Sequence, residues 1–438
     1  MNVTKRDGRI VEFDKSKIVK AIMKAFVETY SDALPDDAAS VCDKIASEIE
    51  SRNTDMRVED IQDVIVKKLM GSKYKDVATQ YVEYRYLHEM ARNRYDELMD
   101  AVAEKLQAKN VQNQNANVDE HSFGGRVGEA SDVVNKQYAL EFIVSKMARD
   151  NHVNNEIYIH DLSSYAIGNH NCLTLPLDDL LANGFNTRQT DVRPAQSINT
   201  AMQLVAVLMQ LQSLQQFGGV AAGHLDWTMI PYVRKSFYKH YRDGMKYLCG
   251  EPNWNLNNFI EDAIADGDLP SSAGVEDIPI GHYGFYPNYA DDFGDYRPVY
   301  QYAMDMTVKE CYQATEGLFH NLNTLQSRSG NQLPFSSINY GTCTLPEGRM
   351  VIKAILDVSI KGVGKLHRTS VFPCGIFQLM AGVNRKPGDP NYDLFRLALK
   401  STAKRLYPNY ANCDWSGNAG YDKNDPKTFF ATINKTVA

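Results

Sequence analysis

The hydrophobic positions near the start of the chain follow two different periods. Val3–Arg6 and Ile10–Phe13 are short runs that contain β-branched or aromatic residues, and Asp7-Gly8 lies between them. An Asp-Gly pair suits the positive φ angles of a tight turn, so the two runs are predicted to form an antiparallel hairpin. From Asp14 onwards, apolar residues recur about every four positions, which is the spacing of one helix face. The pattern therefore predicts a hairpin followed by a helix.

Four stripes of apolar residues at helical spacing follow the predicted hairpin. They run through residues 14–30, 38–49, 58–70 and 74–88. The first stripe places one apolar residue in each turn: Ile18, Ile22, Phe26 and Tyr30. The opening segment is therefore predicted to be a small α+β module with four helices.

The pattern changes between Gln107 and Ser131, where Asn, Gln and Gly dominate. This composition is compatible with a linker or with an ordered loop. Further along, helical stretches alternate with short apolar or turn-bounded runs: Ile157–His160, Asn171–Leu175, Phe335–Tyr340 and Ser370–Phe377. Such alternation favours an α/β architecture. Because 438 residues exceed the usual size of one hydrophobic core, two or three domains are expected.

Composition and charge exclude several classes of protein. A net charge of −7 argues against a large nucleic-acid footprint. The most apolar window, Ala201–Leu214, is interrupted by glutamines and is too short to span a bilayer. Residues Met1–Phe13 carry three basic side chains but no apolar core, so they do not resemble a secretory signal. We expect a cytoplasmic protein that binds neither nucleic acid nor membrane.

The cysteines point away from disulfides and structural zinc. There are seven, widely spaced and without any C-x-x-C pair: Cys42, Cys172, Cys249, Cys311, Cys343, Cys374 and Cys413. An odd, dispersed set disfavours a disulfide framework, and the missing C-x-x-C pairs disfavour a thiolate zinc ribbon. No metal site is expected from these residues.

A basic island lies at the start of this acidic chain. Between Met1 and Lys24 there are seven basic and three acidic residues. Lys5 and Arg6 precede the predicted turn, and Lys17 falls in the first turn of the following helix. Cations beside a helix N-terminus suit a triphosphate. A solvated basic surface explains the same residues equally well.

These residues resemble the ATP-cone domain over about residues 1–95. The match rests on three segments: Val3-Thr4-Lys5-Arg6-Asp7-Gly8, Phe13-Asp14 and Lys17-Ile18. The resemblance implies binding of ATP or dATP with Mg²⁺, and regulation in which activity rises with ATP and falls with dATP. The residues it points to are Lys5, Arg6, Asp14 and Lys17, with Gln62 and Arg85 as further candidates.

A second resemblance covers about residues 110–432. Ile157-Tyr158-Ile159-His160-Asp161-Leu162 and Gly168-Asn169-His170-Asn171-Cys172 resemble the segment of anaerobic, glycyl-radical ribonucleoside-triphosphate reductases that carries an active-site cysteine. Four other segments match in the same order: Asn115-Ala116-Asn117, Phe217-Gly218-Gly219, Gln332-Leu333-Pro334-Phe335 and Gly388-Asp389-Pro390-Asn391-Tyr392-Asp393. Each is weakly specific, but together they are strongly specific.

The resemblance assigns roles to four residues near this cysteine. Reductases of this family use a thiyl radical on one face of the ribose and a second cysteine on the other, and Cys172 matches the second. Asn171 would hydrogen-bond near the reacting hydroxyls, and His160 and Asp161 would order the supporting loop. Without the resemblance, Cys172 is a small buried hydrophobe and His160 a satisfied structural histidine.

The same family binds an effector nucleotide at a dimer interface, where it selects the substrate. Candidates for this specificity site are Gln196, Ser197, Gln203 and Lys239. Amide and hydroxyl groups read base edges, and a lysine meets phosphate. An ordinary amide-rich helix surface is the alternative.

The last residues depart from the family pattern. After Lys427–Thr432 the family continues with Met-Gly-Cys-Arg, whose cysteine carries the thiyl radical, whereas this chain reads Ile433-Asn434-Lys435-Thr436-Val437-Ala438. The thiyl cysteine, a four-cysteine zinc site and the radical-storing glycine are therefore expected to lie outside this sequence. The implied fold is an ATP cone (1–95) followed by roughly half of a ten-stranded α/β barrel of the glycyl-radical type (96–438). Cys374 and Cys413 are expected to be packing residues.

The resemblance implies an anaerobic oxidoreductase that makes deoxyribonucleotides. Its implied partners are ribonucleoside triphosphates, a second copy of the chain, a radical-SAM activating enzyme, and formate or a glutaredoxin-like reductant. The alternative is a catalytically inactive nucleotide-binding fragment that pairs with an intact or split reductase. A transcriptional repressor with an ATP cone is disfavoured by the acidic charge and the lack of C-x-x-C. A downstream reading frame that encodes the missing tail would favour the enzyme.

Overall fold

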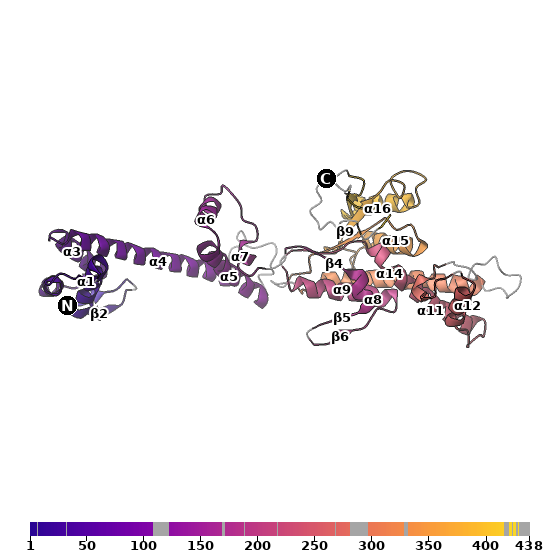
Figure 1. Ribbon diagram of the computed structural model, residues 1–438, viewed down its shortest axis with the longest axis horizontal. Coiled ribbons are helices and arrows are strands. Elements are labelled where there is room, and N and C mark those ends of the chain that lie inside the picture. Colours follow the sequence, from indigo (N-terminus) through magenta and orange to yellow (C-terminus); the bar gives the residue numbers. More distant parts are fainter. Residues whose placement is uncertain are drawn as a thin grey trace. The chain divides into compact units, whose positions relative to one another are not determined.

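The computed structural model divides the chain into two compact units, Met1–Ala103 and Glu104–Ala438. The described residues are 1–438 without 7, 32, 108–121, 169–170, 188, 217, 268, 281–296, 328–331, 416–419, 423, 426–427 and 429–438. Figure 1 shows the helices and strands of both units.

The first unit contains a three-stranded sheet, the first three helices and α4 as far as Ala103. Strand β1 (Asn2–Thr4) pairs antiparallel with β2 (Ile10–Glu12) and parallel with β3 (Met56–Arg57). The helices are α1 (Lys15–Tyr30), α2 (Ala38–Ser51), α3 (Val58–Met70) and α4 (Lys75–Gln107). The predicted hairpin and helices are confirmed. Strand β3 was not predicted, because two residues carry no periodicity.

Local signals in the sequence account for this arrangement. Gly8 has a φ of +79°, and its N–H donates to the carbonyl of Lys5 (3.0 Å), which closes the hairpin turn. Asp14 caps α1, because its carboxylate accepts the N–H of Ser16 at 3.0 Å. The helices bury one apolar stripe each, and Phe26 meets Tyr74 edge to face with ring centres 4.9 Å apart.

The second unit begins with short helices: α5 (Phe123–Tyr138), the π-helix η2 (Ala139–Ile143), α6 (Lys146–Val153) and α7 (Leu162–Tyr165). The expectation of a linker or loop is wrong for residues 123–131, which belong to α5. Ser122 starts this helix by accepting the N–H of Gly125 at 3.0 Å, and this cap offsets the poor helix propensity of the two glycines. Residues 108–121, with Asn115-Ala116-Asn117, lie outside the described residues.

A five-stranded parallel sheet organises the remainder of the second unit. Its strands are β4 (Leu173–Leu175), β7 (Val220–Ala222), β8 (Ser336–Tyr340), β9 (Cys374–Leu379) and β10 (Asn409–Asn412). They lie in the order β10-β9-β8-β7-β4, and all neighbours are parallel. Helices alternate with these strands along the chain, so the predicted α/β architecture is confirmed.

The connections between these strands are mostly helical. They comprise α8 (Leu177–Asn183), the hairpin of β5 (Phe185–Asn186) and β6 (Asp191–Val192), α9 (Ile198–Ser213), α10 (Leu225–Thr228), α11 (Ile230–Leu248), α12 (Leu256–Ala265), η3 (Val275–Asp277), α14 (Arg297–Thr324), α15 (Pro346–Lys361) and α16 (Tyr392–Arg405). Helix α14 packs against α9, α11 and α15. Their apolar faces and Val220, Ile338 and Phe377 of the sheet form one core. None of the helices in the described ranges combines the length and the apolar composition needed to cross a membrane.

Candidate functional site

A pocket in the first unit brings together four of the residues predicted to bind nucleotide. Lys5, Asp14, Lys17 and Gln62 line a cavity of about 240 Å³, although they come from the hairpin, the start of α1 and α3. The remaining lining residues include apolar side chains such as Val3 and Ile61. The cavity therefore combines an apolar floor with two ammonium groups, an amide and two carboxylates, those of Asp14 and Glu12.

The charges of this pocket are fixed by local contacts. The pKa of Asp14 is lowered, first because the Ser16 hydroxyl donates to its carboxylate (2.6 Å), and further by Lys17, whose Nζ lies 3.5 Å away. Burial raises the pKa of Tyr81, another lining residue, to about 12, so its phenol stays neutral. The Lys17 side chain is 74% exposed, so the pocket opens to solvent beside this ammonium group.

Arg6 does not line the pocket, but it contacts Gln62, which does. Its Nε lies 2.6 Å from Glu59 Oε1, and its Nη2 donates to Gln62 Oε1 at 3.0 Å. Burial opposes the ionisation of Glu59, but its own backbone N–H and Arg6 lower the pKa of this carboxyl below its usual value. The guanidinium of Arg6, which the sequence analysis assigned to phosphate, is thus already paired with the carboxylate of Glu59.

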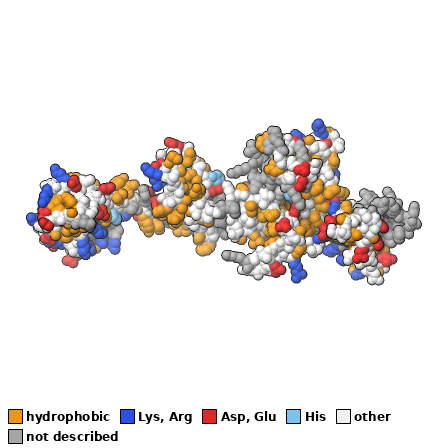
Figure 2. Space-filling model, viewed as in Figure 1, with side chains coloured by type: hydrophobic (Ala, Val, Ile, Leu, Met, Phe, Trp, Pro, Cys, Tyr) orange, Lys and Arg blue, Asp and Glu red, His pale blue; other side chains and the backbone are white. Residues whose placement is uncertain are grey.

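Arg85 lies in a different hollow of the same unit. Its Nη1 lies 2.6 Å from Asp63 Oδ1, and both residues line a cavity of about 320 Å³ between α3 and α4. The structure therefore places four of the six predicted nucleotide ligands in one pocket, a fifth beside it, and the sixth outside. Figure 2 shows lysine and arginine side chains gathered with carboxylates on this unit.

Cys172 lies at the amino end of β4, an edge strand of the parallel sheet, and is exposed. Its Sγ donates to Asn171 Oδ1 at 3.6 Å. Gly218 touches Asn171 so closely that a Cβ at Gly218 would overlap the Asn171 carbonyl oxygen. Two motifs that are far apart in the sequence therefore meet at this cysteine. Asn169, His170 and Phe217 of these motifs lie outside the described residues.

The other cysteines differ from Cys172 in exposure. Cys249 is also exposed, whereas the remaining five are buried. Burial raises the pKa of Cys42 to about 11 and that of Cys311 to about 12, and it raises the pKa of Cys374 as well. Such thiols are poor nucleophiles and poor redox groups at neutral pH.

His160 and Asp161 form a pair, with Nδ1 and Oδ2 2.7 Å apart. Asp161 has a φ of +54° and precedes α7, which packs against α5. The left-handed backbone of Asp161 is one that Asp tolerates better than most residues. The Asp161 side chain makes no cap hydrogen bond to α7, so the contact that these two side chains make is with each other.

The residues predicted to bind an effector nucleotide are only partly brought together. Gln196 and Lys239 line a cavity of about 540 Å³ beside α11. Ser197 instead caps α9, where its Oγ accepts the N–H of Thr200 at 3.2 Å, and Gln203 is exposed on the same helix. Two further cations that the sequence analysis missed, Lys235 and Arg242, also line the cavity. They lie about one turn on either side of Lys239, a spacing that could have revealed them.

A neighbouring cavity of about 360 Å³ shares Lys235 and Glu276 with the first. Its other lining residues include Trp227, Tyr232 and His224, whose Nε2 lies 3.0 Å from Asp178 Oδ2. A cavity lined by both aromatic rings and hydrogen-bonding groups suits a planar, hydrogen-bonding ligand. A basic chamber and an aromatic chamber thus lie side by side along α11.

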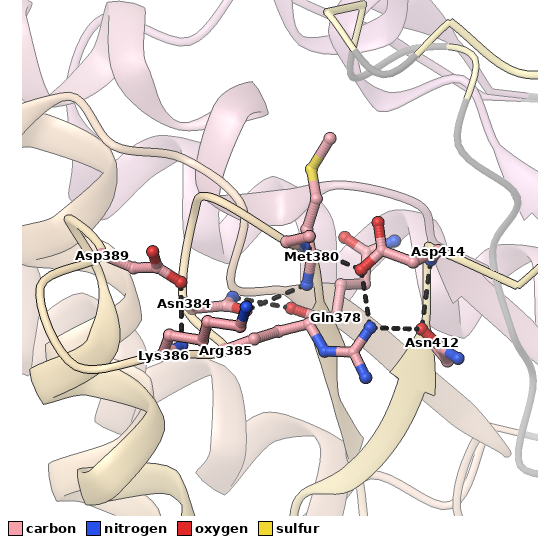
Figure 3. Close-up of polar contacts among 9 residues, drawn as sticks. Gln378, Met380, Asn384, Arg385, Lys386, Asp389, Asn412 and Asp414 are labelled. Carbon is pink, nitrogen blue, oxygen red and sulfur yellow. Dashed lines mark hydrogen bonds and ion pairs between the residues drawn. The ribbon is translucent and has the colours of Figure 1, made fainter.

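The polar residues that follow β9 form hydrogen bonds with one another and with the residues that follow β10. Figure 3 shows Arg385 bonded to Asp414 (2.8 Å) and Asn384 accepting the N–H of Met380 (2.9 Å). Asp389 of the Gly388–Asp393 motif accepts the N–H of Lys386 at 2.8 Å. Asn391 of this motif donates to the Cys343 carbonyl at 2.8 Å. Within the described residues, therefore, this motif stabilises turns. No group of three or more His, Cys, Asp or Glu side chains in that part of the chain is arranged to hold a metal ion.

Comparisons with known proteins add independent information. Residues 114–430 match the family model described as anaerobic ribonucleoside-triphosphate reductase, and residues 1–90 match that of the ATP cone domain. The chain is 30% identical over 421 residues to an anaerobic ribonucleoside-triphosphate reductase of Haemophilus influenzae, covering 94% of this chain and 52% of that protein. It is 29% identical over 416 residues to the reductase of the same name from Escherichia coli, covering 94% and 51%.

The chain thus spans about half the length of the curated relatives it matches. Among solved structures, the anaerobic ribonucleotide reductase of Thermotoga maritima in complex with dATP and CTP aligns with a TM-score of 0.44 and 14% identity. That alignment covers 76% of this chain and 50% of the other.

Proposed function

The chain belongs to the family of anaerobic ribonucleoside-triphosphate reductases, and we propose that it contributes one active-site cysteine and the nucleotide-binding regulatory domain to that reaction. The observation that carries the proposal is Cys172, an exposed thiol at the amino end of β4, inside the segment that matches the family. Gly218 and Asn171 of two separate family motifs meet beside it.

In the proposed reaction, the family's glycyl radical supplies the unpaired electron that starts the chemistry. On one face of the ribose, the family's thiyl cysteine would take the hydrogen atom from the 3′ carbon, and the 2′ hydroxyl would take up a proton and leave as water. From the opposite face, the thiol of Cys172 would deliver a hydrogen atom to the 2′ carbon while Asn171 holds the hydroxyls by hydrogen bonds. The thiyl cysteine would then return the 3′ hydrogen atom. Formate or a glutaredoxin-like protein provides the reducing electrons.

We propose that the five parallel strands are half of a ten-stranded barrel. Strands β4 and β10 are the two edges of the described sheet. Unpaired strand edges require cover by further strands or by other elements. Five additional strands would pair these edges and close the barrel. In this proposal residues 1–95 form the regulatory domain and residues 96–438 the barrel segment.

The pocket of the first unit is proposed to bind ATP or dATP together with Mg²⁺. Lys5 and Lys17 would meet the phosphates at the open side, and Gln62 and Asp14 would contact the nucleoside. The match of residues 1–90 to the ATP cone supports this assignment. Arg6 would join the phosphates only after leaving Glu59.

Calorimetry with dATP tests the regulatory pocket. The double variant Lys5→Ala/Lys17→Ala should bind dATP more than about tenfold more weakly, since two charge-assisted contacts are lost. Lys20→Ala/Lys24→Ala is the matched control, because it removes the same charge from the same region at exposed positions that do not line the pocket. Unchanged affinity in the first variant, or equal loss in both, would remove the assignment.

The cavity beside α11 is proposed to be the specificity site for an effector nucleotide. Lys235, Lys239 and Arg242 would bind phosphate, and Gln196 would contact the base or sugar. Ser197 and Gln203 are weaker candidates, because the first is a helix cap and the second lies on the exposed face of α9. The family's partners, a second copy of the chain and a radical-SAM activating enzyme, and a cytoplasmic location complete the proposal.

A second function is favoured by one observation. Both proposed nucleotide pockets are formed by residues of this chain, although it spans only about half of its relatives. A nucleotide-binding subunit that pairs with an intact or split reductase would have these properties. Turnover of a ribonucleoside triphosphate, measured after the chain is combined with a polypeptide that supplies the family's thiyl cysteine and glycyl radical, distinguishes the two. Turnover that Cys172→Ser abolishes supports the enzyme, and nucleotide binding without such turnover supports the subunit.

A further inference from the structure

A buried glutamine lies directly before the segment that holds the glycine pair touching Asn171. Gln216 is 4% exposed and follows α9. Its Nε2 donates to the carbonyls of Gly218 (3.2 Å) and Gly219 (2.8 Å), and its Oε1 accepts from Gln212 Nε2 at 2.8 Å. Both ends of the amide are therefore engaged, and its orientation is fixed by this network.

The two carbonyls that Gln216 binds belong to the turn that supports the reactive cysteine. The Gly219 carbonyl also accepts the N–H of Leu173 at 3.0 Å, and Leu173 is the residue after Cys172. Gly218 lies against the backbone and side chain of Asn171, at a distance that leaves no room for a Cβ. A displacement of the turn would therefore reach Asn171 and Cys172 directly.

Glycine pairs are conformationally free, so this turn needs an external restraint. Gln216 supplies it, because one amide group clamps two successive carbonyl oxygens. The clamp is tied in turn to Gln212 in α9, a helix whose apolar side is part of the unit's core. The geometry thus connects a rigid helix to the Asn171-Cys172 pair.

We infer that Gln216 is a positioning residue that holds the Gly218-Gly219 turn and thereby fixes the Asn171-Cys172 pair for reaction. Its significance for catalysis rests on the proposed function. The clamp itself is a property of this chain and needs no turnover. The chemistry that defines it is an amide N–H donor, which a side chain of similar volume without a donor cannot replace.

The test measures how fast iodoacetamide alkylates Cys172 relative to Cys249, by mass spectrometry of the full chain. Both thiols are exposed, so Cys249 serves as an internal reference. Gln216→Leu removes the donor and should raise the Cys172:Cys249 rate ratio about fivefold, the factor equivalent to a buried hydrogen bond of about 1 kcal/mol. Gln210→Leu is the matched control, because Gln210 of α9 also donates to a backbone carbonyl, that of Asn321.

The Gln216→Glu variant separates hydrogen bonding from packing, because a packing effect on the alkylation ratio would not depend on pH. The ionised carboxylate of this variant has no donor for the two carbonyls, whereas its protonated form regains one. Burial raises the pKa of such a carboxyl, so it should become protonated within the measured pH range. At each pH, the Cys172:Cys249 alkylation ratio of this variant is divided by that of the wild type. This quotient should fall as the pH is lowered from roughly 8 to 5.5. This experiment uses one nearly isosteric protein and remains informative if the leucine variant does not fold.

The outcomes separate this inference from the proposed function. An elevated ratio in Gln216→Leu with a pH-dependent ratio in Gln216→Glu supports the clamp, whether or not the chain turns over. A ratio in Gln216→Leu within about twofold of wild type, equal changes in Gln210→Leu, or a flat pH profile in Gln216→Glu overturns it. If the ratio responds as expected but no nucleotide is reduced even when a polypeptide with the family's thiyl cysteine and glycyl radical is added, the proposed function is rejected and the clamp is retained.

Discussion

At the residue scale, the contact of Glu59 with Arg6 bears most directly on the proposed nucleotide pocket. Arg6 Nε and Glu59 Oε1 are 2.6 Å apart, and Arg6 also donates a hydrogen bond to Gln62, which lines the pocket. In the proposed complex, a triphosphate that recruits Arg6 would compete with this carboxylate for the guanidinium. Both side chains are about one third exposed, so solvent screens the pair and the competition is modest.

Glu59→Gln should therefore tighten dATP binding by about threefold, because the neutral amide releases Arg6 for phosphate. Isothermal calorimetry on the full chain measures this. Glu48→Gln makes the same change of charge in α2, where Glu48 pairs with Lys68. Equal tightening in both variants would attribute the effect to net charge and contradict the competition.

Asp226 provides a pH-dependent prediction in the second unit. Desolvation raises the pKa of this fully buried carboxyl, although the N–H groups of Cys343 (3.0 Å) and Gly341 (2.9 Å) oppose the shift. Because the folded-state pKa exceeds the unfolded value, ionised Asp226 costs stability near neutrality. This cost declines as the pH falls from the folded-state pKa towards the lower unfolded-state pKa.

Urea unfolding of wild type and Asp226→Asn checks this sign. The free energy of unfolding of wild type relative to the variant should increase on going from about pH 7 towards pH 5, by at most about 1.4 kcal/mol per pH unit. Tryptophan fluorescence isolates the second unit, since Trp227, Trp254 and Trp415 all belong to it. A difference that stays constant with pH, or falls as the pH is lowered, would show that Asp226 does not prefer its protonated form in the folded chain.

At the element scale, the junction of β4 and β7 depends on a glycine. Gly218→Ala would place a Cβ onto the Asn171 carbonyl oxygen, so backbone must move and the fold should lose about 1–3 kcal/mol. Urea unfolding followed by fluorescence measures the loss. The control is Gly317→Ala in α14, where a Cβ meets nothing within 4 Å.

Gly317→Ala should have the opposite effect and stabilise by about 0.5–1 kcal/mol, because alanine is the better helix former in a helix interior. The two substitutions add the same methyl group, so opposite signs identify the close approach of Gly218 to Asn171 as the cause. A neutral Gly218→Ala would mean that the two motifs do not touch as described.

The elements themselves could be predicted wherever a pattern was long enough. Val58–Met70 was predicted to the residue, because its apolar stripe begins and ends with the helix α3. Helix α4 continues beyond the predicted residue 88 to Gln107, where helix-forming residues persist although the stripe weakens. The two-residue strands β3, β5 and β6 were not predicted, since they are fixed by their partners rather than by their own composition.

At the scale of the whole molecule, the first unit has its own core. The buried residues of that cluster all lie between Val3 and Tyr81, and α4 extends past them to Gln107. A fragment of residues 1–107 should therefore fold cooperatively and bind dATP within about twofold of the full chain. Circular dichroism on heating and calorimetry test this. A fragment that lacks a thermal transition, or that folds without binding, would contradict an autonomous nucleotide-binding unit.

The sequence by itself determined what depends on neighbours in the chain. The hairpin turn at Gly8, the cap at Asp14 and the apolar stripes of the helices are local, and they are sufficient to place Lys5 and Lys17 near a helix N-terminus. Family resemblance added Cys172 and Asn171, whose motif is equally local.

Only the tertiary structure decided which distant residues meet. It placed Gly218 against Asn171, Glu59 against Arg6, and Lys235 and Arg242 in the cavity with Gln196, and it left Arg85 outside the proposed nucleotide pocket. The physical reason is that periodicity specifies which face of an element is buried, whereas the partner of that face is set by packing between elements far apart in sequence.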